Sequence, residues 1–184
     1  MGLLDDAIKK LGQAAGAATK SRRKRPAWGP RDPDKADYGK AGAPTPDMDA
    51  LVTDAEIEAV TGASPEGEPR RNGPDGSEVD LGRHVIRESK LSNGDEFLIS
   101  LGNCTDAPAA QLAMDRVAEV EKPLPGVGER GLLRVKRYRK TGASEIGVMA
   151  LQGNFTLSLT HTSREGKTDP APLKELLEKA LKRL

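Results

Sequence analysis

Apolar and polar residues follow regular periods from about residue 47 to the end of the chain. Stretches with a two-residue period are typical of β-strands. The turn Ser92-Asn93-Gly94-Asp95 separates the first two of them and predicts a hairpin, because Asn-Gly suits a tight turn. The predicted strands are 83–91, 96–104, 132–139, 144–151 and 154–162.

Three stretches in the same region have the three-to-four-residue period of amphipathic helices. Thr53-x-x-Glu56 is a capping box that opens the first, and Gly62 ends it. The second begins near Thr105 or Asp106 and ends before Pro123. The third, 169–184, begins with an Asp169 cap and with Pro170 as its first helical residue. The second helix is expected to direct these residues inward: Leu112, Ala113, Met114, Val117 and Val120.

The order of elements is helix, two strands, helix, three strands, helix. An antiparallel sheet of about five strands covered by helices is the simplest way to bury their apolar faces, so the expected class is α+β. The ordered domain is expected to span residues 47–184.

Residues 1–46 have a different character and are expected to form an extension of this domain. Residues 3–19 predict a weak amphipathic helix, because its apolar stripe is largely alanine and Gly12 and Gly16 lower helix propensity. A polybasic run follows, and a tract rich in Pro, Gly and Asp then reads as a flexible linker to Pro46.

Charge is distributed unevenly along the chain. Residues 1–46 carry 10 Lys and Arg against 5 Asp and Glu, a balance of +5, whereas residues 47–184 carry 19 against 23, a balance of −4. Basic segments beside amphipathic helices bind anionic surfaces. The candidate surface-binding residues are therefore Lys20, Arg22, Arg23, Lys24 and Arg25. The alternative is a solvated tail that binds nothing.

A second basic cluster decorates one predicted strand around Tyr138. We expect it to be mainly a solvated face or edge of the sheet, where charges oppose strand-to-strand aggregation. It remains a weaker candidate for anion binding. Its members are Arg134, Lys136, Arg137, Arg139 and Lys140.

Two glycine-rich stretches resemble nucleotide-binding loops but have the wrong context. Gly126, Gly128 and Gly131 fit G-x-G-x-x-G, yet a helix end precedes them and a strand follows, which reverses the dinucleotide-binding arrangement. Gly166-Lys167-Thr168 is half of a P-loop, but His161 stands where its first glycine belongs. We expect both stretches to be turns, and we predict no cofactor.

No arrangement of residues indicates catalysis or a metal site. Cys104 is the single cysteine and is expected to be a small buried or half-buried residue. His84 and His161 stand alone and are expected on the surface or on strand faces. The carboxylates are scattered, so no acid–base pair stands out.

The N-terminus has early acidic residues and no apolar core typical of a secretory signal. No stretch approaches the roughly 18 apolar residues of a transmembrane helix. Asp6 breaks the myristoylation pattern. We expect a cytoplasmic protein, peripheral at the membrane.

Several short motifs resemble a domain of actinobacterial cell-envelope lipoproteins and extracellular sensor regions. They are Leu51 to Glu56, Pro125 to Gly131, Gly153 to Thr156 and Leu177 to Leu184. The resemblance covers about residues 48–184 and implies a PsbP-like α/β sandwich that binds a ligand or partner without known catalysis. Exported members of that group carry a signal or lipobox and often paired cysteines, and we find neither here.

Three functional hypotheses follow from these observations. The first is a non-catalytic binding or interaction module that its basic N-terminal segment tethers to an anionic membrane surface or a protein partner. The second is a nucleic-acid-associated protein that uses the basic tail and the basic strand. The third is an enzyme of a type that no motif identifies.

Overall fold

A computed structural model describes residues 46–71, 84–167 and 169–184, all of which belong to one compact unit. The predicted helix 3–19, the polybasic run and the linker lie outside the described residues. The extension and its division from the domain therefore stay predictions.

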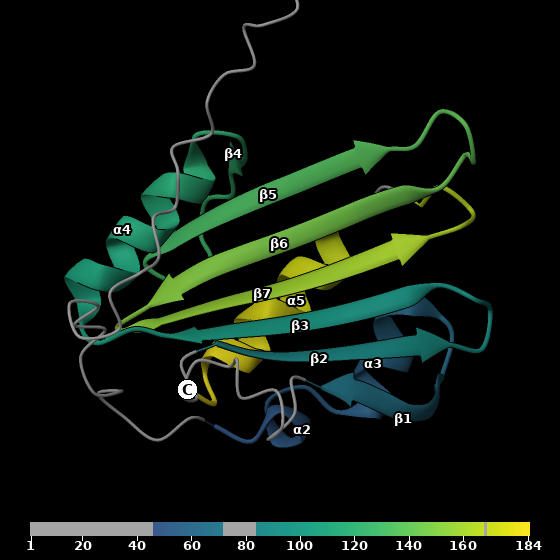
Figure 1. Cartoon of the computed structure of the whole chain (residues 1–184), viewed down its shortest axis with the longest axis horizontal. Helices are drawn as coiled ribbons and strands as arrows, with labels where there is room; N and C mark the ends of the chain where they lie inside the picture. The colour runs from purple at the N-terminus through teal and green to yellow at the C-terminus, as the bar shows by residue number, and fades with distance from the viewer. Residues whose placement is uncertain (1–45, 72–83, 168) are drawn as a thin grey trace, which may run out of the picture. The chain divides into compact units, whose positions relative to one another are not determined.

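The described residues form one seven-stranded antiparallel sheet (Figure 1). The strands follow the order β1-β2-β3-β7-β6-β5-β4, and every neighbouring pair is antiparallel. The strands are β1 (Pro65–Arg71), β2 (His84–Leu91), β3 (Glu96–Asn103), β4 (Lys122–Pro123), β5 (Arg130–Arg137), β6 (Ser144–Gln152) and β7 (Phe155–Ser163).

Four helices accompany the sheet within the described residues. They are α2 (Met48–Leu51), α3 (Asp54–Thr61), α4 (Ala107–Ala118) and α5 (Ala171–Leu181). In Figure 1, α5 runs behind the sheet with α3 beside it. The α+β class is confirmed, but the sheet has seven strands instead of about five.

All five predicted strands are present, and the two additional strands lie at the sheet edges. The sequence of β1, PEGEPRR, has no apolar alternation, and it forms a strand because it pairs along β2. Strand β4 has only two residues and pairs with Leu132 and Leu133. Both edge strands depend on tertiary pairing, which overrides their weak local propensity.

The main core lies between one face of the sheet and the helices α2, α3 and α5. Odd-numbered residues of β3 and β7 point into it, and among them Phe97, Ile99, Leu101, Leu157 and Leu159 are fully buried. Burying each such side chain stabilises the fold by about 2 kcal/mol. Helix α5 completes this core with Leu173, Leu176, Leu177, Ala180 and Leu181.

Helix α4 covers part of the opposite face of the sheet. Its buried residues Ala110 and Met114 pack against Leu132 and Leu151. The prediction that Leu112 and Val120 point inward is wrong, since they are 54% and 79% exposed. Leu112 lies about 200° around the helix from Ala110, and Val120 comes after the helix has ended.

The start of α5 also differs slightly from the prediction. Pro170 is the N-cap residue and Ala171 begins the helix, so Pro170 is not the first helical residue. The Asp169 carboxylate still accepts a hydrogen bond from the Ala171 N–H at 3.0 Å. The predicted Asp169 cap is therefore wrong, since Pro170 occupies the N-cap position without a side-chain bond and Asp169 lies one residue before it.

Candidate functional site

The second face of the sheet is polar and only partly covered. Strand β7 is the central strand of the sheet, and its even-numbered residues point toward this face. The face therefore presents a row of hydroxyl groups. Helix α4 packs over one end of β6 and β7. The row of hydroxyl-bearing residues is Thr156, Ser158, Thr160 and Thr162, all partly exposed.

A cavity of about 470 Å³ lies where α4 meets this face. Small ligands bind in clefts of about 300–1,000 Å³ that combine an apolar lining with a few polar groups. The lining residues that carry the argument are Gly102, Ala109, Ala113, Val117, Met149 and Thr156, with His84, Asn103 and Cys104 also among them.

Small residues keep this cleft open. Ala109 and Ala113 lie one turn apart on α4 and both line the cleft, so no large side chain fills it from these positions. A Cβ atom at Gly102 would lie 2.4 Å from Oγ1 of Thr156 and would clash with it. Glycine at this position therefore leaves room for the Thr156 hydroxyl.

The polar groups of the cleft come from β2, β3, β7, the segment before α4 and, through Arg116, α4 itself. Nε2 of His84 lies 2.6 Å from Oγ of Ser100. Asn154 donates to Oδ1 of Asn103 at 2.9 Å and to the Cys104 carbonyl oxygen at 3.1 Å. These bonds fix the end of β3, from which Asn103 and Cys104 border the cleft.

Cys104 is half-buried, as predicted. Burial and the nearby carboxylate of Asp106 raise the pKa of the Cys104 thiol. The thiol is therefore protonated at neutral pH and acts as a small, weakly polar part of the cleft wall.

The structure places the weaker basic candidates on β5 and in the turn that follows it, where several are already paired. Arg134 forms ion pairs with Glu121 and with Glu145, the latter at 3.5 Å. Lys136 lies 3.4 Å from the Glu145 carboxylate, and the Tyr138 hydroxyl donates to it at 2.7 Å. Burial raises the pKa of Glu145, but Tyr138, Lys136 and Arg134 together lower it by more. The pKa of Glu145 is therefore below its usual value.

The other members of this cluster are exposed. Arg137 ends β5, and Arg139 and Lys140 lie in the turn that leads to β6. The structure thus places the five basic residues on one strand and its turn, but it does not bring them to the cleft. The stronger candidates, from Lys20 to Arg25, lie outside the described residues.

The glycine motif is a turn, as the sequence predicts. Gly126 and Gly128 have φ values of 77° and 56°, which L-residues rarely adopt. A Cβ atom at Gly131 would lie 2.3 Å from the Leu124 carbonyl oxygen. Each glycine has a conformational or packing reason, and a strand follows the turn instead of a helix.

A buried His161–Asp95 pair was missed by the sequence analysis. Nε2 of His161 lies 3.0 Å from Oδ2 of Asp95, and both side chains are buried. Asp95 also accepts bonds from the Arg164 N–H at 2.8 Å and from the Asn93 side chain at 3.0 Å. His161 shares the inward parity of Leu157 and Leu159, which was the available signal for its burial.

The pKa values of this pair follow from its surroundings. Burial lowers the pKa of His161 more than the hydrogen bond to Asp95 raises it. Burial raises the pKa of Asp95, but the bonds from Arg164, His161 and Asn93 bring it below its usual value. A neutral His161 imidazole that donates its Nε2–H to a charged Asp95 carboxylate accounts for both lowered pKa values.

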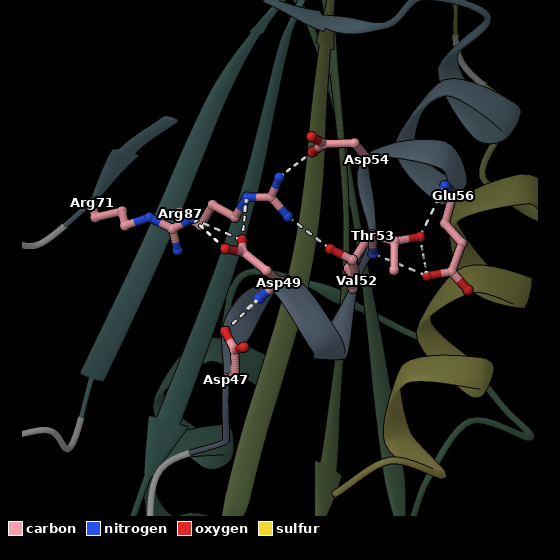
Figure 2. A network of polar contacts seen from close by, with 8 residues as sticks. All are labelled: Asp47, Asp49, Val52, Thr53, Asp54, Glu56, Arg71 and Arg87. Carbon is pink, nitrogen blue, oxygen red and sulfur yellow. Dashed lines mark hydrogen bonds and ion pairs between the residues drawn. The ribbon is translucent and has the colours of Figure 1, made fainter. Parts of the chain in front are cut away.

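Arg87 is a second buried charge that the sequence analysis missed (Figure 2). Its guanidinium donates to the Val52 carbonyl oxygen at 2.7 Å and to the Asp54 carboxylate. Its Nε also lies 3.2 Å from Asp49, to which Arg71 donates at 2.7 Å. This network joins α2 and α3 to the β1–β2 edge, so we interpret it as structural.

Within the described ranges, no group of three or more His, Cys, Asp and Glu side chains could hold a metal ion. No helix in the same part of the chain is long and apolar enough to cross a membrane.

Comparisons with known proteins identify a shared fold only. No protein-family model matches the chain, and no curated protein matches it. Among solved structures, the chain is similar to the extracellular domain of PknH from Mycobacterium tuberculosis, with a TM-score of 0.51 and 10% identity. The match covers 79% of this chain and 98% of that domain. The fold is therefore one that an actinobacterial extracellular domain also adopts.

Proposed function

We propose that this protein is a non-catalytic binding module and that the cleft between α4 and the open sheet face holds its ligand. The single observation that carries the proposal is the cleft itself, a cavity of about 470 Å³. Its size and mixed lining are those of small-molecule sites.

The lining supports a small amphipathic ligand. Ala109, Ala113, Val117 and Met149 offer an apolar wall for an aliphatic or aromatic body. The hydroxyl of Thr156 borders the same space and supplies hydrogen-bonding capacity for one polar end of that ligand.

The non-catalytic part of the proposal rests on the state of the reactive groups at the cleft. The Cys104 thiol has a raised pKa, so its nucleophilic thiolate form is disfavoured. His84 contacts Ser100 at 2.6 Å, and no carboxylate among the described residues orients this imidazole. The binding role of the resembling actinobacterial domains, and the fold shared with the PknH extracellular domain, agree with this view.

We further propose that the basic N-terminal segment tethers the domain to an anionic membrane surface. Five Lys and Arg residues near such a surface would contribute roughly 5 kcal/mol before ordering costs, enough for reversible attachment. The cytoplasmic leaflet carries the anionic lipids that attract such segments. A location in the cytoplasm, peripheral at the membrane, follows from this proposal. The tethering residues are Lys20, Arg22, Arg23, Lys24 and Arg25.

The finer family assignment is part of the same proposal. We place residues 48–184 with the PsbP-like sandwich domains of actinobacterial lipoproteins and sensor regions, on the strength of the motifs described above. An antiparallel sheet with helices on both faces is compatible with that assignment. The alternative is a nucleic-acid-associated protein, which the exposed Arg139 and Lys140 keep open.

The cleft is tested with the fluorescent probe 1-anilinonaphthalene-8-sulfonate and the full chain. Ala113→Trp places a large ring in the cleft and should weaken probe binding at least about tenfold. Gln111→Trp is the matched control, since Gln111 is an exposed residue of the same helix. Equal probe binding by both variants would refute the cleft as the site.

The tether is tested by salt-dependent binding to two surfaces, phosphatidylserine-containing vesicles and duplex DNA. A full-length variant with Gln at all five tethering positions should lose vesicle binding. A control that neutralises five exposed cations elsewhere, at Lys90, Lys122, Arg164, Lys179 and Lys182, should retain it. Tighter binding of DNA than of vesicles, lost when residues 134–140 are neutralised, would favour the alternative function.

A further inference from the structure

We propose that the outer edge of β5 around Val135 binds an acidic, extended segment of a protein partner as an additional strand. This inference goes beyond the proposed function and concerns a surface that shares no lining residue with the cleft. It can therefore be true or false independently of that proposal.

The hydrogen-bond alternation of the sheet leaves the backbone of Val135 available. Backbone groups of successive residues in an antiparallel strand point to opposite neighbours. The Tyr138 N–H bonds to the Ala143 carbonyl, toward β6, and the Gly131 carbonyl accepts from the Leu124 N–H, away from β6. Val135 has the parity of Gly131, so its N–H and C=O also point away from β6.

Strand β4 ends before it reaches this position. It pairs only Lys122 with Leu133 and Pro123 with Leu132. The chain that precedes Lys122 comes from the end of α4, as Figure 1 shows. Among the described residues, no strand therefore pairs with the outer edge of Val135.

A hollow of about 270 Å³ borders this edge and exposes apolar side chains. Val120 is 79% exposed and Val135 is 46% exposed, and both line the hollow. Strand addition uses backbone hydrogen bonds for affinity and pockets for alternate side chains for specificity. An apolar side chain beside Val135 would cover both valines.

The positive charge around this edge favours an acidic partner segment. Lys122 and Lys136 line the hollow, and Arg139 and Lys140 follow in the exposed turn. A second copy of this strand would bring its own cations against them, and like charges that face each other across strands destabilise the pairing. An acidic segment has no such penalty.

The pattern of that segment follows from strand geometry. If an apolar residue lies opposite Val135, its two neighbours point to the other face of the sheet, where Lys136 lies. Acidic residues at those two positions would approach Lys136. The Lys136 side chain is 52% exposed, and Glu145 also has Arg134 and Tyr138 as partners, so Lys136 can exchange its partner at low cost.

The test uses a fluorescein-labelled peptide of alternating glutamate and valine, about nine residues long, and the full chain. Fluorescence anisotropy should show binding that weakens with added salt. A peptide N-methylated at every valine lacks the donors that face β5 and should bind at least about tenfold more weakly. N-methylation at every glutamate leaves that edge intact and should change binding less than about threefold.

Two protein variants provide the complementary control. Val135→Pro removes the outward N–H without removing a bond to β6 and should weaken binding at least about tenfold, while Val135→Thr retains that N–H and should weaken binding less than about threefold. Unchanged binding of the valine-methylated peptide would overturn the proposal, whatever the folding of the proline variant. Absence of binding, equal binding of a lysine–valine peptide, or self-association through this edge would also overturn it.

Discussion

The guanidinium of Arg87 donates a hydrogen bond to the carbonyl oxygen of Val52 across 2.7 Å. Val52 lies between α2 and α3, whereas Arg87 lies on β2 and is only 3% exposed. Asp54 and Asp49 neutralise the buried cation from the same helical segment. One side chain thereby fixes the α2–α3 segment against one edge of the sheet (Figure 2).

Replacement of Arg87 by Met should therefore destabilise the fold. The change leaves the Val52 carbonyl without its donor, and bonds from a charged group contribute about 1.5–3 kcal/mol. The two partner carboxylates are half exposed or more, so they regain water and do not add the full penalty of a buried unpaired charge. Urea denaturation should show a loss of about 2 kcal/mol in the free energy of unfolding.

Arg70→Met is the matched control, because Arg70 pairs with Glu88 at 3.5 Å on the neighbouring strand but is largely exposed. It should change the free energy of unfolding by less than about 0.5 kcal/mol. Equal effects of the two substitutions would contradict the structural role of Arg87.

The glycine motif makes a second prediction. Gly131→Ala would place Cβ 2.3 Å from the Leu124 carbonyl oxygen and 3.3 Å from Val127, so the backbone of the turn must shift. Such crowding should cost about 2–4 kcal/mol of unfolding free energy. Gly153→Ala meets open space at φ 58° and should cost only about 1 kcal/mol. Urea denaturation of both variants separates crowding from backbone strain, and equal losses would refute the crowding.

Hydrophobic periodicity was sufficient to predict the central elements of the fold. The five long strands and helices α3, α4 and α5 carry their own pattern. Strand β1 does not, since its pairing depends on the edge that β2 presents. The four-residue helix α2 is likewise too short to show a hydrophobic period of its own. It depends on tertiary contacts such as the one between Arg87 of β2 and the carboxylate of Asp49.

The cleft could not be predicted in the same way, because it depends on where α4 lies relative to the sheet. Two partial signals were nevertheless present. The hydroxyl-bearing parity of β7, from Thr156 to Thr162, indicates a sheet face that is not a packed core. Ala109 and Ala113, one turn apart, indicate that one side of α4 carries only small side chains. Neither signal states that the two features face each other.

The ion pair between Glu56 and Arg183 predicts a dependence of stability on acid. Hydrogen bonds from Arg183 at 2.6 and 2.8 Å lower the pKa of Glu56 to about 2, although burial opposes this, and Thr53 lowers it further. A depressed folded-state pKa means that the contribution is complete above the unfolded value of about 4.3 and is lost as pH falls toward 2.

Glu56→Gln removes this charge but retains a residue that can complete the capping box. The variant should be less stable than the unmodified protein at pH 7, by on the order of 1 kcal/mol after allowance for solvent screening. The difference should shrink between about pH 5 and pH 2 in urea denaturation. A difference that stays constant over this range would contradict the ion pair.

The buried His161–Asp95 pair predicts a second dependence, at milder pH. Because burial lowers the pKa of His161, the folded protein resists protonation that the unfolded chain accepts near pH 6.5. The unfolded state then binds more protons, so the free energy of unfolding should fall as pH decreases below about 6.5. His161→Gln keeps an N–H donor for Asp95 but cannot titrate, so its stability should fall less between about pH 7 and pH 5.

Nuclear magnetic resonance of the imidazole provides the direct measurement, with His84→Gln used to assign the remaining histidine. A His161 midpoint at or above 6.5, or parallel stability curves for the unmodified protein and His161→Gln, would show that the imidazole is not held neutral in the fold.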